Sequence, residues 1–135
     1  MKILIICSKA FYPDIPPVQA KLEQTGHTIL LPNSYDNVNA EQQAWDNGTH
    51  SQFKKAMFQA SKDKIKEVDA VLCLNFEKNG QPDYIGGATF LELYDAFTYG
   101  KKIYLYNDIP QGMLYDEIEG FEPILIHRDL TVIKD

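Results

Sequence analysis

The sequence has few cysteines and no run of basic residues. Its two cysteines, Cys7 and Cys73, lie in separate apolar stretches, without Cys-x-x-Cys spacing or a nearby histidine cluster. This argues against a disulfide framework, and we interpret both as small buried residues of a protein from a reducing compartment. Acidic residues (19) outnumber Lys and Arg (13), giving a net charge of -6. We therefore expect no nucleic-acid partner, although local backbone dipoles can still favour a small anionic ligand.

Long apolar segments and the common nucleotide-binding motifs are also missing. No apolar run reaches the roughly 18 residues of a membrane span, and "MKILIIC" is too short for the apolar region of a secretory signal. We therefore expect a soluble, cytoplasmic protein that does not engage a membrane. Neither Gly-x-Gly-x-x-Gly nor a P-loop occurs, and the carboxylates and histidines lack ligand spacing, so we expect no cofactor and no metal.

Enough apolar residues are present for one well-filled core. The chain has 135 residues, of which 44% are hydrophobic and 12% aromatic. This length and composition predict a single domain over residues 1–135 that folds without disulfides or metals.

Short apolar runs alternate with helix-like segments along the chain. The expected strands are Lys2–Cys7, Thr28–Leu31, Asp69–Leu74, Lys101–Tyr106 and Pro123–His127. The expected helices are Pro16–Gly26, His50–Val68, Ala88–Tyr99 and Leu114–Glu119. The helix 50–68 has an apolar face made of Phe53, Met57, Ala60, Ile65 and Val68. The polar segment Ser34–Gly48 has no clear periodicity, and we expect a long functional loop there.

This alternation predicts an α/β fold with a five-stranded parallel sheet covered by helices on both faces. Right-handed crossovers leave few topologies, and we favour strand order 2-1-3-4-5, a flavodoxin- or Rossmann-like three-layer sandwich. Ligands of such sheets bind beyond the carboxyl ends of the strands. The loops that follow the first four strands are therefore the candidate binding loops.

The segment "YIGGATFLELYDAF" places one carboxylate, Glu92, among apolar residues. Thr89 and Glu92 have the spacing of a capping box, in which Glu92 would have a structural role. If the helix begins before Thr89, Glu92 instead lies beyond the first turn and projects towards the candidate site. There the helix dipole would keep the carboxylate ionised and available as a nucleophile. The residues alone leave both interpretations open.

The stretch "IGGATFLELYDAFTYGKKIYLY" resembles the central motif of the nucleoside 2-deoxyribosyltransferase family. The matching positions are Gly86, Gly87, Glu92, Leu93, Ala96, Gly100 and Lys101. The start of the chain is also similar to that of family members, with matches at Ser8, Phe11, Gly26, His27 and Pro32. Where the transferases have an Asp and the related deoxynucleoside-monophosphate N-glycosidases a Ser, this chain has Gly86. We cannot assign a position in this sequence to the Asn that the transferases supply from a neighbouring subunit or to their C-terminal Tyr.

The resemblance implies that Glu92 is the nucleophile and that Asp69, which opens the third strand, protonates the departing base. The residues expected to contact a nucleoside or nucleotide substrate are Ser8, Phe11, Tyr12, Tyr84, Gly86, Gly87 and Thr89. Among these, the aromatic rings are candidates for stacking on a base. The resemblance also implies a homodimer or larger homo-oligomer.

The expected activity is cleavage or transfer of the N-glycosidic bond of (deoxy)nucleosides or nucleotides through a covalent glycosyl-Glu intermediate. Two alternatives stay open. One is a binding module for nucleosides or nucleotides that keeps the pocket and lacks turnover. The other is a flavodoxin-like domain whose third helix serves only oligomer contacts.

Overall fold

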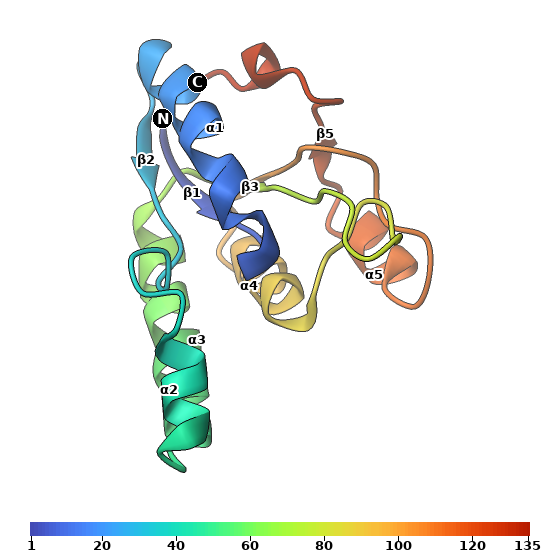
Figure 1. Cartoon of the computed structure of the whole chain (residues 1–135). Coiled ribbons are helices and arrows are strands. Elements are labelled where there is room, and N and C mark those ends of the chain that lie inside the picture. Colours follow the sequence, from blue (N-terminus) through green and yellow to red (C-terminus); the bar gives the residue numbers. More distant parts are fainter.

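Five parallel strands form the sheet of the computed structural model, which describes residues 1–135 (Figure 1). The strands are β1 (Lys2–Ile6), β2 (Thr28–Leu30), β3 (Ala70–Cys73), β4 (Lys102–Leu105) and β5 (Ile124–Leu125). Their order is β2-β1-β3-β4-β5, and all four neighbouring pairs are parallel. The predicted α/β class, strand number and strand order are confirmed.

The helices follow the expected segments with one addition. They are α1 (Ile15–Gln24), α2 (Ala40–Asp46), α3 (His50–Glu67), α4 (Gly87–Thr98) and α5 (Tyr115–Gly120), with 3₁₀ turns η1 (Lys9–Asp14) and η2 (Leu130–Val132). The prediction of a continuous loop from Ser34 to Gly48 is wrong, because α2 lies within it. Only Ala44 of this short helix is buried, so its sequence carries no apolar stripe to reveal it.

Helices cover both faces of the sheet, as a three-layer arrangement requires. Alternate residues of β1 point to opposite faces: Ile3 and Ile5 pack with Leu22 of α1, whereas Leu4 and Ile6 pack with α3, α4 and α5. The side chains at the centre of both packed layers are fully buried. Removal of this apolar surface from water on both sides fixes the register of the sheet.

The amino-terminal half of α3 extends away from the sheet, with α2 packed beside it (Figure 1). Ile65 and Val68, at the other end of the expected apolar face, are fully buried in the core. Phe53 and Met57 lie beyond the sheet and line a cavity instead. The apolar face of α3 therefore serves two purposes, packing at one end and enclosing a site at the other.

The two chain termini meet at the amino edge of the sheet (Figure 1). The terminal amine contacts the Asp135 carboxylate at 2.6 Å and lies 3.1 Å from His27 Nδ1. His27 Nε2 is 3.2 Å from the carbonyl oxygen of Ile133. His27 is buried and tethers the carboxyl-terminal segment, so its role is structural. None of the helices has the length and apolar character needed to cross a membrane.

Candidate active site

A cavity of about 350 Å³ opens at the carboxyl edge of the sheet, where ligands of this type of fold are expected. It is lined by the segment after β1, the segment after β2, the extended half of α3 and the start of α4. The predicted site residues that line it are Ser8, Tyr12, Gly86, Gly87, Thr89 and Glu92. The fold therefore brings together segments that lie far apart in the sequence.

Helix α4 begins earlier than a capping box would allow. Gly86 has an extended backbone and is the N-cap, and Gly87 is the first helical residue. No side chain caps this helix end. Thr89 lies inside the first turn and is buried, so it cannot act as the cap with which Glu92 would pair. The capping-box interpretation of Glu92 is therefore wrong.

Glu92 lies beyond the first turn of α4, half-buried in the cavity wall. Desolvation raises its pKa from 4.5 to about 7. A hydrogen bond from Ser61 and the charges of Lys64 and Lys54 oppose this shift. The helix dipole was expected to keep the carboxylate ionised, but burial outweighs it, so the side chain titrates near neutral pH.

Polar groups on α3 and after β2 support the carboxylate from the other side of the cavity. The Asn33 amide donates to Ser61 Oγ at 3.0 Å and to the Met57 carbonyl at 3.3 Å, which fixes both against the cavity wall. Lys64 Nζ donates to the Leu31 carbonyl at 2.7 Å. The partners of Glu92 are therefore held in place before any ligand binds.

Tyr12 lines the cavity and packs against Tyr35, with ring centroids 5.6 Å apart. Burial is the main reason that its pKa is raised, so the hydroxyl stays protonated and can donate a hydrogen bond. Of the three aromatic residues expected to contact a base, Tyr12 is the one in the cavity wall.

Phe11 and Tyr84 do not line the cavity. Phe11 is buried in the core, edge-on to Phe76 at 5.3 Å and to Tyr84 at 6.4 Å between ring centroids. The Lys78 ammonium covers the ring of Tyr84 at 4.7 Å from its centroid. The expectation that these two rings stack on a base is wrong for this structure, because other side chains already occupy their contacts.

The Tyr84 hydroxyl lies close to the start of α4. A Cβ built on Gly86 would be 3.1 Å from the Tyr84 hydroxyl oxygen, closer than an ordinary van der Waals contact. Tyr84 thus crowds the space that a side chain at position 86 would need.

Asp69 lies at the opposite edge of the sheet from the cavity. It precedes the first residue of β3, and its carboxylate accepts a hydrogen bond from the Lys2 amide at 2.8 Å. The four residues of β3 separate it from the carboxyl edge by a distance on the order of 13 Å. The predicted role of Asp69 as proton donor is therefore wrong, and its position gives it a structural role between β1 and β3.

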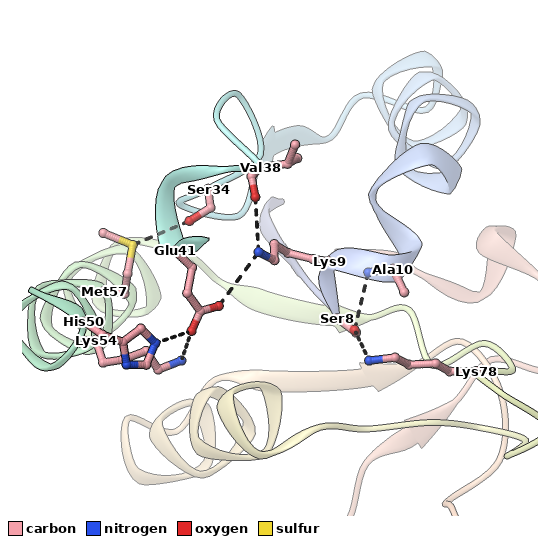
Figure 2. Close-up of polar contacts among 10 residues, drawn as sticks. All are labelled: Ser8, Lys9, Ala10, Ser34, Val38, Glu41, His50, Lys54, Met57 and Lys78. Carbon is pink, nitrogen blue, oxygen red and sulfur yellow. Dashed lines mark hydrogen bonds and ion pairs between the residues drawn. The ribbon is translucent and has the colours of Figure 1, made fainter. Parts of the chain in front are cut away.

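Glu41 is a cavity residue that the sequence analysis missed. Its carboxylate lies 2.8 Å from His50 Nε2, 3.8 Å from Lys9 Nζ and 3.8 Å from Lys54 Nζ (Figure 2). The hydrogen bond from His50 is the largest cause of its lowered pKa, so Glu41 is ionised at neutral pH. The segment Ser34–Gly48 was expected to be functional, but its polar sequence did not single out this residue.

Lys9 and Lys78 were also missed, although both belong to loops that follow strands. Lys9 Nζ donates to the Val38 carbonyl at 3.1 Å, and Lys78 Nζ lies 3.5 Å from Ser8 Oγ (Figure 2). The sequence feature that could have identified them is a lysine in a segment that follows a strand, at the ligand-binding edge of an otherwise acidic protein. No cluster of three or more His, Cys, Asp or Glu side chains suited to a metal ion is present.

No protein-family model and no curated protein sequence matches the chain. Solved structures do match. The 2-deoxyribosyltransferase of Bacillus psychrosaccharolyticus aligns with a TM-score of 0.59 at 16% identity, over 87% of this chain and 80% of the enzyme. The CMP N-glycosidase of Clostridium botulinum aligns with a TM-score of 0.52 at 15% identity, over 97% and 93% of the two chains. The chain therefore shares its fold with a nucleoside 2-deoxyribosyltransferase and with a nucleotide N-glycosidase.

Proposed function

We propose that the protein cleaves or transfers the N-glycosidic bond of 2-deoxynucleosides or nucleotides, with Glu92 as nucleophile. The observation that carries this proposal is a half-buried carboxylate, beyond the first turn of α4, in the wall of the cavity at the ligand-binding edge of the sheet. One enzyme that shares the fold is named a 2-deoxyribosyltransferase and the other a CMP N-glycosidase, and these names support the same reaction class.

The proposed reaction proceeds in two displacements. A carboxylate oxygen of Glu92 forms a bond to the anomeric carbon, and the bond from that carbon to the base nitrogen breaks, with its electron pair leaving on the base. The departing base takes a proton from solvent water, and a glycosyl ester of Glu92 remains. Water or a second base then attacks the same carbon and releases the carboxylate, so the configuration is retained.

The remaining cavity residues are proposed to bind the substrate. The free backbone amides at Gly87 and Ala88 and the side chains of Ser8, Tyr12 and Thr89 line the same cavity as Glu92. Bare glycines at the start of α4 allow close approach of a ligand to this backbone. Phe53 and Met57 of α3 supply the apolar surface against which a base can pack.

A binding module without turnover is the second candidate function. One observation favours it: Glu41 is the other carboxylate of the cavity, and the hydrogen bond from His50 together with the charges of Lys54 and Lys9 lowers its pKa, so it cannot readily protonate a departing base. On this alternative the cavity still binds a nucleoside or nucleotide, but the N-glycosidic bond stays intact.

Release of free base distinguishes the two candidates. The protein is incubated with 2′-deoxynucleosides and their 5′-monophosphates, with and without an acceptor base, and products are separated by chromatography. We expect free base from wild type and at least about a 1,000-fold slower release from Glu92→Gln, the range typical for loss of a nucleophile. Ligand binding without base release would support the binding module, and absence of both would refute the proposed function.

Self-association is proposed from the exposed apolar face of α4. Leu91, Tyr94 and Phe97 are each about half exposed, and Phe121 packs against Phe97 with ring centroids 5.4 Å apart. This face neighbours the side of α4 that carries Glu92, and we propose that a second copy of the chain covers it. Light scattering should give at least a dimer mass for wild type and a monomer mass for Tyr94→Glu. A monomeric wild type would refute it.

A further inference from the structure

We infer that the substrate carries a phosphate group and that Lys78 is the side chain that binds it. This inference rests on the proposed function, because it concerns the ligand of the same cavity. It follows from the balance of charged groups around the cavity and from the contacts of each lysine. Together these leave one lysine without an anion.

The cavity is locally cationic in a chain of net charge -6. Three lysines line it, Lys9, Lys54 and Lys78, against two carboxylates, Glu41 and Glu92. Glu92 is held partly protonated at neutral pH by its burial, which shifts the local balance further towards positive charge. A cavity of this sign attracts an anionic ligand, whereas the net negative charge of the protein repels anions from the rest of its surface.

Two of the three lysines already have an anionic partner within the protein. Lys9 and Lys54 each lie 3.8 Å from the Glu41 carboxylate, and Lys9 also donates to the Val38 carbonyl (Figure 2). His50 completes this group at 2.8 Å from Glu41. Lys9 and Lys54 therefore share Glu41 as their anion, and this side of the cavity keeps an excess of positive charge.

Lys78 has no such partner. No carboxylate lies within ion-pair distance of its ammonium, which contacts only the Ser8 hydroxyl at 3.5 Å and the face of Tyr84 at 4.7 Å from the ring centroid. The residue is half-buried, so part of its hydration is lost without a compensating charge. The cation–π contact holds the side chain in place and offsets part of that cost.

The position of Lys78 suits the phosphate of a nucleotide. Lys78, Ser8 and Gly86 line the same 350 Å³ cavity as Glu92, so one ligand can meet both Lys78 and the nucleophile. Figure 2 shows Lys78 beside Ser8 and away from Glu41, His50 and Lys54. A phosphate monoester brings a charge of about −1.5 to −2 and acceptor oxygens for an ammonium and a hydroxyl. A neutral nucleoside would leave Lys78 uncompensated.

The test compares phosphorylated and unphosphorylated forms of one substrate. We would measure kcat/KM by base release, and Kd by calorimetry, for the four common 2′-deoxynucleosides and their 5′-monophosphates. Wild type should prefer the best monophosphate over its nucleoside at least about 10-fold, and Lys78→Met should reduce that preference ratio at least about 10-fold. Lys78→Arg should keep most of the ratio, because it keeps the charge.

The matched control is Lys55→Met, which removes an exposed lysine of α3 that does not line the cavity. Its preference ratio should equal that of wild type. The inference is overturned if wild type cleaves or binds nucleosides as well as monophosphates, or if Lys78→Met keeps the wild-type ratio. If calorimetry shows the Lys78-dependent preference and neither substrate form is cleaved, the phosphate site stands and the proposed function fails.

Discussion

Replacement of Glu92 by Gln should stabilise the protein at alkaline pH while abolishing its activity. Burial raises the pKa of Glu92 from 4.5 to about 7 in the folded state. In the unfolded chain the carboxyl group ionises near its ordinary pKa, so below pH 4.5 the group is neutral in both states and has no electrostatic cost. Between pH 4.5 and 7 the unfolded state loses the proton first. The folded state is therefore progressively destabilised as the pH rises.

The size of this effect follows from the shift. A difference of roughly 2.5 pKa units, each worth 1.36 kcal/mol, gives a penalty of about 3 kcal/mol that is complete above pH 7. Glu92→Gln removes the ionisable group and keeps nearly the same shape. The variant should match wild type near pH 4.5 and exceed it by up to about 3 kcal/mol at pH 8.

Urea unfolding of wild type and variant at pH 5 and pH 8 measures this difference in the free energy of unfolding. The contributions of most other titrating groups are the same in the two proteins and cancel in the comparison. Glu67→Gln, which removes an exposed carboxylate at the end of α3, is the matched control and should show little change at either pH. A variant that loses about 1 kcal/mol at both pH values would refute the reasoning. That result is the one a structural cap predicts.

Three further predictions concern the same site and its surroundings. Because only ionised Glu92 can attack, kcat/KM should rise about tenfold per pH unit below 7 and level off above it; a flat profile from pH 5.5 to 8.5 would contradict this. Gly86→Ala should lower the free energy of unfolding by about 1 kcal/mol, because the added methyl group meets the Tyr84 hydroxyl. In a double-mutant cycle, Tyr84→Phe should relieve part of that loss. Purely additive effects of the two substitutions would show that the hydroxyl does not crowd this position. Burial raises the pKa of Cys7 to about 12 and raises that of Cys73, so neither thiol should react with iodoacetamide in the folded protein, and rapid labelling without unfolding would disprove their burial.

Most of the fold was predictable because its signals are local and repeated. The continuous apolar runs of β1, β3 and β4 indicate strands buried on both faces, and the handedness of crossovers restricts their order. Helix α2 was not predictable, since it is short, buries one residue and depends on contact with α3. Its stability comes from tertiary packing rather than from its own sequence.

The candidate site was predictable in part. The glycine pair at the start of α4 and the strand order together placed Glu92 at the ligand-binding edge. Asp69 was assigned by resemblance alone, although a residue that opens a parallel strand lies at the edge away from the ligand. The environments of Phe11, Tyr84 and Lys78 depend on which side chains meet in three dimensions, and no pattern along the chain reveals that.

The most direct test of the central claim is mass spectrometry of the protein quenched in acid during turnover. If Glu92 is the nucleophile, a fraction of the protein should gain the mass of one deoxyribosyl or deoxyribosyl-phosphate group, and peptide mapping should locate it on Glu92. The adduct should be absent from Glu92→Gln. Base release by wild type with the sugar attached to another residue, or full activity of Glu92→Gln, would contradict the account.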